Sequence, residues 1–108
     1  MLLEHGAEVN APDQRDATPA HLAAKGGHGE ALKLVVAAGA DVNGKDNDEE
    51  APLHWAARNG HVSAAQALVE VGAAVDARTK FRDTPLNLAL LFGEIEVAEL
   101  LRQHGATD

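Results

Sequence analysis

The chain has 108 residues and a formal net charge of −8, and it contains no cysteine. Excess acid argues against binding to nucleic acid or to an anionic membrane surface, since both require clustered Lys and Arg. Without cysteine there is neither a disulfide framework nor a thiolate metal site. The sequence shows no signal-peptide pattern and no apolar run long enough to span a bilayer, so we expect a cytoplasmic protein.

The sequence repeats with a period of 33 residues. The period is visible in three sets of equivalent positions: Gly6, Gly39, Gly72, Gly105; Pro19, Pro52, Pro85; Gly27, Gly60, Gly93. A fixed period of this length indicates a solenoid, in which each unit packs only on its neighbours. We therefore predict one all-α repeat domain over residues 1–108, with a partial repeat at 1–12 and repeats at 13–45, 46–78 and 79–108.

The first helix of each repeat is expected to begin at a Pro and to end near a Gly. The starts are Thr18-Pro19, Ala51-Pro52 and Thr84-Pro85. A Thr hydroxyl accepts a free amide of the first turn, and Pro suits the first helical position because its missing N–H costs nothing there. Ala51 has no such acceptor, so the middle helix should begin less firmly.

The second helices are expected at about 30–38, 62–71 and 95–104. Each is followed by a Gly (Gly39, Gly72 or Gly105), which suits the left-handed position at a helix C-terminus. Apolar residues at helical spacing should form the buried face: Ala31, Leu34, Val35, Ala64, Ala67, Leu68, Val97, Leu100 and Leu101. In the loops that follow, Val42 and Val75 should be buried.

These residues resemble a known family. Thr18-Pro19-Ala20-His21-Leu22-Ala23-Ala24 with Gly27-His28 and Gly39-Ala40-Asp41-Val42-Asn43 is similar to the ankyrin repeat, and the segments starting at Ala51 and Thr84 repeat the pattern. The resemblance implies antiparallel helix pairs joined by β-hairpin loops. It also implies protein–protein binding without catalysis or a cofactor.

Two departures from the family pattern stand out. Asp16, Glu49 and Arg82 occupy the hairpin position where the family usually has Gly. Glu and Arg tolerate a left-handed conformation poorly, so we expect strained or reshaped hairpin tips. Asn87 replaces the usual His, which should alter the side-chain bonding of the last first helix.

By resemblance, the binding surface consists of the hairpin tips and the exposed face of the first helices, which together form a concave groove. The candidate residues do not follow the repeat, unlike the framework around them: Arg15, Asn47, Asp48, Trp55, Arg58, Asn59, Lys80, Phe81, Leu91 and Phe92. Trp, Phe and Arg are effective interface anchors because they desolvate large areas. For Trp55 a second interpretation stays open, namely packing across the stack like Leu22 and Leu88.

Catalytic and metal-binding motifs are absent from the sequence. His21 and His54 recur one period apart, as do His28 and His61, so we interpret them as structural hydrogen-bonding residues. No Gly-x-Ser-x-Gly elbow or phosphate loop is present. We predict that the protein is not an enzyme and holds no metal.

The nature of the partner is less defined by sequence. The net charge favours a protein with a basic patch, although surplus acid also simply maintains solubility. Acidic residues gather at one tip and basic residues at the next, so Glu49 and Arg82 could pair across repeats. The short first repeat predicts an uncovered N-terminal edge that another copy could cover. Alternatively, the chain is part of a longer array that acts as a scaffold or regulatory domain, or an engineered scaffold without a natural partner.

Overall fold

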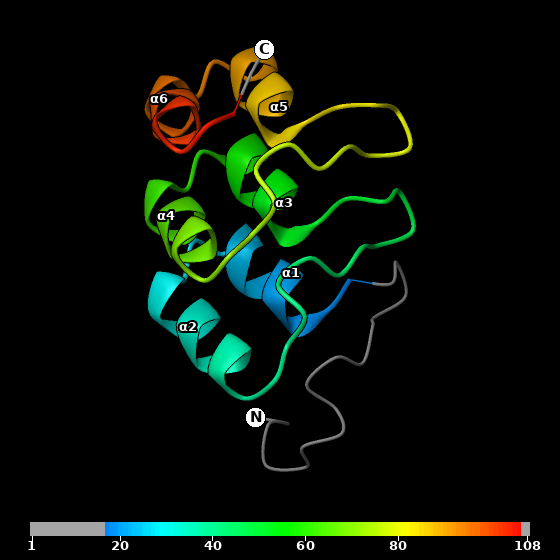
Figure 1. The fold of residues 1–108 in the computed structure, drawn as a ribbon, viewed down its shortest axis with the longest axis vertical. Helices are drawn as coiled ribbons and strands as arrows, with labels where there is room; N and C mark the ends of the chain where they lie inside the picture. The colour runs from blue at the N-terminus through cyan, green and yellow to red at the C-terminus, as the bar shows by residue number, and fades with distance from the viewer. Residues whose placement is uncertain (1–16, 107–108) are drawn as a thin grey trace.

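The computed structural model describes residues 17–106, which form three stacked pairs of helices (Figure 1). The helices are α1 (Pro19–Lys25), α2 (Gly29–Ala37), α3 (Pro52–Asn59), α4 (Val62–Glu70), α5 (Pro85–Leu91) and α6 (Ile95–Gln103). α3 packs against α1 and α5, and α4 packs against α2 and α6, so the first and second helices form two layers. The expected all-α stack is confirmed.

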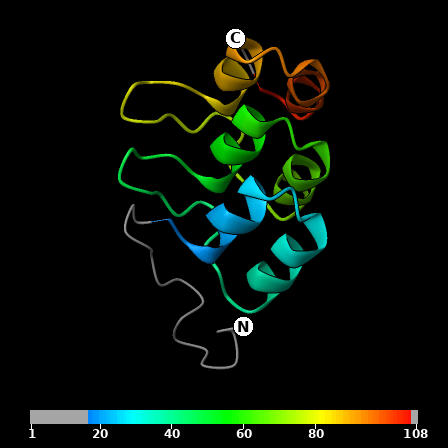
Figure 2. The same cartoon turned by 180° about the vertical axis from the view of Figure 1, so that it is seen from behind.

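Long loops join one pair to the next, and they project together from one side of the stack (Figure 2). Within the described residues they contain no β-strand; each is closed instead by a few turn hydrogen bonds at its tip. None of the six helices is long and apolar enough to cross a bilayer.

The predicted helix starts are confirmed. Thr18 Oγ1 accepts the backbone N–H of His21, and Thr84 Oγ1 accepts that of Asn87 at 3.1 Å. Both helices also receive a reciprocal bond, from the backbone N–H of the Thr to His21 Nδ1 or Asn87 Oδ1, each at 3.0 Å. Ala51 forms no side-chain cap, as expected, and keeps only the reciprocal half of this arrangement.

Left-handed backbone occurs at the positions that the sequence indicated. Gly39, Gly72 and Gly105 have φ of 106°, 98° and 98° at the ends of the second helices. At the hairpin tips, Glu49 and Arg82 have φ of 60° and 72°, so these two side chains occupy a conformation that favours Gly. The prediction for Asp16 lies outside the described residues, as does the partial repeat at 1–12.

The buried face of α2 differs from the predicted one. Leu32 and Val35 are buried, whereas Leu34 is 67% exposed. Leu34 lies on the side of α2 that faces away from α4, where no described residue covers it. Val42 and Val75 are half-buried rather than buried, and they pack against the edge of the core.

Neighbouring pairs approach closely at the turn between their two helices. A Cβ atom added to Gly27 would lie 2.8 Å from Nδ1 of His61, and one added to Gly60 would collide with the carboxylate of Glu94. Each Gly therefore makes room for a side chain 34 residues further along the chain. The stack thus has a fixed register from one repeat to the next.

Candidate functional site

A buried carboxylate organises the tip of the first hairpin. Asp46 Oδ1 accepts the backbone N–H groups of Asp48 and Glu50, both at 2.9 Å. The Asp46 N–H donates to the Glu50 carbonyl at 3.0 Å, and the Glu49 N–H donates back to the Asp46 carbonyl at 3.0 Å. Asp46 is only 8% exposed, so its charge supports the loop rather than facing solvent.

Thr79 plays the same part in the second hairpin, one period later. Its Oγ1 accepts the N–H groups of Phe81 at 3.0 Å and Asp83 at 3.3 Å. Its N–H donates to the Asp83 carbonyl, and the Arg82 N–H donates to the Thr79 carbonyl. A hydroxyl thus replaces a carboxylate with the loop bonding pattern retained.

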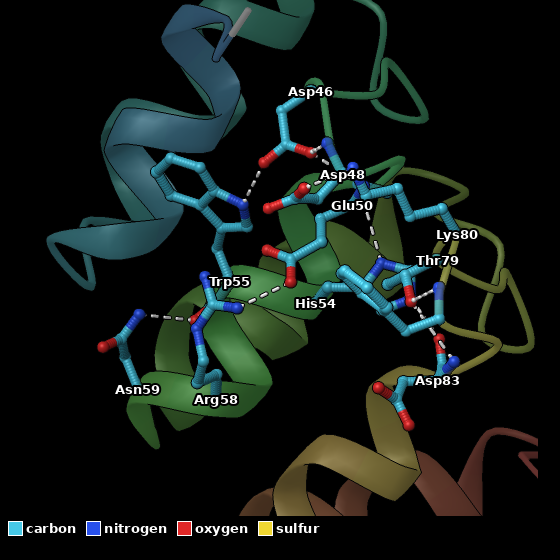
Figure 3. Close-up of polar contacts among 12 residues, drawn as sticks. Asp46, Asp48, Glu50, His54, Trp55, Arg58, Asn59, Thr79, Lys80 and Asp83 are labelled. Carbon is cyan, nitrogen blue, oxygen red and sulfur yellow. Dashed lines mark hydrogen bonds and ion pairs between the residues drawn. The ribbon is translucent and has the colours of Figure 1, made fainter. Parts of the chain in front are cut away.

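The two tips are joined to each other (Figure 3). The Lys80 N–H donates to the Asp48 carbonyl at 3.1 Å, and Lys80 Nζ lies 3.1 Å from Asp48 Oδ1. The cross-repeat ion pair therefore forms between Asp48 and Lys80, not between Glu49 and Arg82 as the sequence suggested. Both side chains are nearly half exposed, so the pair contributes only about 0–1 kcal/mol.

Trp55 does not line a groove. Its side chain is buried, with 3% exposed, and its ring lies edge-on to His21 with ring centroids 5.0 Å apart. The indole Nε1–H donates to Asp46 Oδ2 at 3.0 Å. The prediction of Trp55 as a binding residue is therefore wrong, because the indole fills the space between two repeats, and the packing interpretation holds.

Arg58 and Asn59 lie beside Trp55 and are engaged within the protein (Figure 3). Arg58 Nη1 lies 2.6 Å from Glu50 Oε2, and its guanidinium carbon lies 6.0 Å from the centre of the Trp55 ring. Asn59 Nδ2 donates to the Trp55 carbonyl at 2.8 Å. Both residues border the predicted surface, but their donors are committed to the scaffold.

Two buried histidines tie each first helix to the following hairpin. His21 Nε2 lies 2.6 Å from the Glu50 carbonyl, and His54 Nε2 lies 2.8 Å from the Ala77 carbonyl and 3.0 Å from that of Asp83. Burial lowers the pKa of His54 below its ordinary value of 6.5, and the hydrogen bonds to the carbonyls oppose this only in part. These contacts fit the structural interpretation. Over residues 17–106, no three potential metal ligands gather at one place.

A shallow depression of about 430 Å³ lies between α2 and α4 on the opposite side of the stack from the hairpins. Lys33 Nζ lies 3.3 Å from Glu70 Oε1 across it, and Gln66 Nε2 donates to Glu70 Oε2 at 3.2 Å. The Gln66 bond and the neighbouring Lys33 lower the pKa of Glu70. The lining contains Ser63 but no histidine, so a nucleophile and a base do not meet there.

The remaining predicted site residues are exposed. Asn47 and Lys80 lie at the tips, with Phe81 66% exposed beside them and the Lys80 ammonium 5.4 Å from the centre of its ring. Leu91 and Phe92, at the end of α5, are 72% and 52% exposed. Arg15 lies outside the described residues.

These three apolar residues, Phe81, Leu91 and Phe92, are here named the apolar triad. One period earlier the same positions hold polar residues that all bond within the protein: Asp48 to Lys80, Arg58 to Glu50 and Asn59 to the Trp55 carbonyl. The last repeat thus replaces three internally paired polar side chains by three exposed apolar ones.

Comparison with known families decides the family. A model described as ankyrin repeats in three copies matches residues 1–79 and 38–108, and so covers the whole chain. The chain belongs to the ankyrin repeat family. Ankyrin repeats are generally protein–protein interaction modules and are typically not catalytic. No curated protein matches the chain.

The ankyrin framework accounts for the histidines, the turn glycines and the helix caps. Sequence reasoning missed four further apolar residues that the structure exposes on other parts of the stack: Leu22, Leu34, Leu90 and Ile95. A comparison across the 33-residue period contained part of the signal, because Leu90 stands where earlier repeats have Ala24 and Ala57. Exposure itself depends on which repeat neighbours which, and only the stack shows that.

Proposed function

We propose that this ankyrin chain is a non-catalytic module that binds a partner protein through its hairpin tips and the concave side of its first helices. The apolar triad would supply the main anchors, and Asn47, Asp48, Lys80, Arg58 and Asn59 would form the polar border. The observation that carries the proposal is the exposure of Phe81, Leu91 and Phe92, at 66%, 72% and 52%. Exposed side chains of this size favour association because burying them removes apolar surface from water.

The location of Leu91 supports the concave side as the binding surface. One repeat earlier, Arg58 occupies its position and reaches Glu50 in the hairpin. Leu91 therefore lies on the side of α5 that faces the hairpins, and it contributes no cation to pair with the hairpin. A ligand contacting Phe81 at a tip and Leu91 on the helix would span the groove.

The charge of the chain suggests the kind of partner. A net charge of −8 favours proteins that carry basic residues around the contact, because opposite potentials speed encounter and orient the two surfaces. The proposed partner is therefore a cytoplasmic protein that presents an apolar segment flanked by Lys and Arg. The rigid stack would bind it with little backbone adjustment.

The test is a quantitative pull-down from source cells with the parent chain and the variant Phe81→Ala/Leu91→Ala/Phe92→Ala. Partners that depend on this surface should be captured by the parent and lost with the triple variant. The matched control is Leu34→Ala, which removes an equally exposed apolar side chain from a different face. If the triple variant retains every partner at unchanged affinity, the binding surface lies elsewhere.

A further inference from the structure

The register inside the stack shows which residues of a repeat face the preceding one and which face the next. Trp55 and Ala67 face the preceding repeat, since the former contacts His21 and the latter lines the depression with α2. Gly29 faces the next repeat, because a Cβ added to it would lie 2.6 Å from Ser63 Oγ. The same assignment extends to the two ends of the stack.

At the C-terminal end, apolar residues are exposed where earlier repeats bury them. Leu90 is 40% exposed, whereas Ala24 and Ala57 at the equivalent positions are completely buried. Ile95 is 61% exposed, and its equivalents are the buried Gly29 and the half-buried Val62. We call Leu90, Gly93 and Ile95 the C-terminal face.

Gly93 extends this pattern. Gly27 and Gly60 are each approached by a side chain of the following repeat, but an added Cβ at Gly93 would meet nothing within 4 Å. The C-terminal face therefore has the shape of an internal repeat face without its following repeat.

The N-terminal end shows the complementary condition. Leu22 is 47% exposed, although Trp55 at the equivalent position is 3% exposed; Leu34 is 67% exposed, although Ala67 is 3% exposed. His28 is exposed too, and its equivalent His61 is the side chain that packs on Gly27. We call Leu22, His28 and Leu34 the N-terminal face.

We propose that the C-terminal face of one copy binds the N-terminal face of a second copy, in the register that stacks repeats inside the chain. The two faces lie at opposite ends of the long axis, as Figure 1 shows with α5 and α6 at one end and α1 and α2 at the other. The established interface between repeats continues into each of them. In this register His28 of the second copy packs on Gly93, as His61 packs on Gly27, and Leu90 and Ile95 become covered.

The two faces are unlike, so the contact is heterologous and does not close on itself. Each added copy presents a new C-terminal face or N-terminal face, and the assembly grows as an open helical filament. An isologous dimer, by contrast, would stop at two copies.

Analytical ultracentrifugation of the full chain over a wide concentration range provides the first test. The wild-type mass is expected to rise from the 11.3 kDa of one copy to beyond that of a dimer. Leu90→Glu/Ile95→Glu and Leu22→Glu/Leu34→Glu should each lower the association constant by at least about tenfold, because each pair of charges would be desolvated in the contact. All four side chains are exposed, and circular dichroism checks that both variants stay folded. A wild-type chain that stays monomeric throughout would overturn the proposal.

Mixing the two double variants provides the decisive test. Each alone lacks one face, but together they retain one intact pair of faces, so an equimolar mixture should form a dimer and nothing larger. A mixture that stays monomeric, or a wild-type chain that stops at a dimer, would rule out the head-to-tail contact.

Leu91→Glu separates this proposal from the proposed function. Leu91 lies in the same repeat as Leu90, but on the hairpin side, outside both faces. The variant should self-associate as the wild type does and lose the partner protein. If self-association fails with Leu91→Glu but persists with Leu90→Glu/Ile95→Glu, copies associate through the concave side instead of through the ends.

Discussion

The Nε1 of Trp55 and the Oδ2 of Asp46 are 3.0 Å apart, in a hydrogen bond that joins a first helix to its own hairpin loop. Asp46 Oδ1 accepts two further bonds, from the backbone of Asp48 and Glu50. One buried carboxylate therefore fixes both the loop that carries the tip residues and the indole that separates two repeats. The shape of the proposed binding surface depends on this pair.

Asp46→Ala should lower the free energy of unfolding by about 2–4 kcal/mol, because it leaves the indole N–H and two backbone N–H groups without their acceptor. Urea denaturation followed by the fluorescence of Trp55, the only Trp in the chain, measures the loss. Asn47→Ala, at an exposed position in the same loop, is the control and should change stability by no more than about 0.5 kcal/mol. An equal effect of both substitutions would contradict the role assigned to Asp46.

Arg82→Gly should raise the free energy of unfolding by about 0.5–1 kcal/mol. Arg82 has φ of 72°, a conformation that costs an L-residue about 1–2 kcal/mol and that Gly adopts freely, less the extra entropy that Gly loses on folding. Glu49→Gly, at φ of 60°, should behave in the same way. Urea midpoints measure both effects, and Lys80→Gly serves as the control at a neighbouring position without positive φ. A loss of stability at Arg82 and Glu49 would show that their side chains stabilise the tips more than the backbone conformation costs.

Stability should fall as the pH drops below about 6.5, in part through His54. Burial lowers its pKa in the folded state, so the unfolded chain binds the proton more tightly. Stability associated with the neutral ring is therefore complete above the unfolded pKa and is lost as the pH falls through the folded value. His54→Asn should weaken this dependence, because an amide oxygen can still accept the Ala51 N–H, as Asn87 does for Thr84.

Urea denaturation of the wild type and His54→Asn at several pH values between about 5 and 8 tests this, since a histidine titrates in that interval. The variant will be less stable at pH 8, where it lacks the bonds from Nε2 to Ala77 and Asp83. The informative quantity is the difference in slope. Parallel curves for the two proteins would assign the pH dependence to other groups.

Replacing the apolar triad by its polar counterparts should separate binding from folding. The variant Phe81→Asp/Leu91→Arg/Phe92→Asn copies the residues found one repeat earlier, all at exposed positions, so stability should change by no more than about 1 kcal/mol. Partner capture should be lost in the pull-down, while self-association through the end faces persists. A variant that unfolds would show that the triad stabilises the last repeat.

The sequence predicted most of the scaffold because repeated chemistry at a fixed spacing has local physical causes. Thr caps, Pro at the first helical position and Gly at left-handed positions act within a few residues of one another. The unusual φ of Glu49 and Arg82 was predictable for the same reason. Leu34 was not: a stripe of apolar residues on a helix identifies the face that can be buried, but not whether a neighbour covers it.

The candidate surface was predicted less completely. Phe81, Leu91 and Phe92 are exposed as their irregular placement suggested, but Trp55 is buried and Arg58 is paired with Glu50. Irregularity within a repeat marks positions released from the framework, without distinguishing a solvent contact from a contact that only one repeat makes. The Trp55–Asp46 bond is of the second kind.

The sequence by itself determined the period, the helix boundaries, the caps and the ankyrin family, because each depends on residues close together in the chain. The tertiary structure alone decided which equivalent positions are covered. Leu22 and Trp55 share one position in the repeat, yet one is 47% and the other 3% exposed, because burial depends on the neighbouring repeat rather than on the residue itself. For the same reason, only the stack shows Leu90 and Ile95 as apolar residues on an uncovered end.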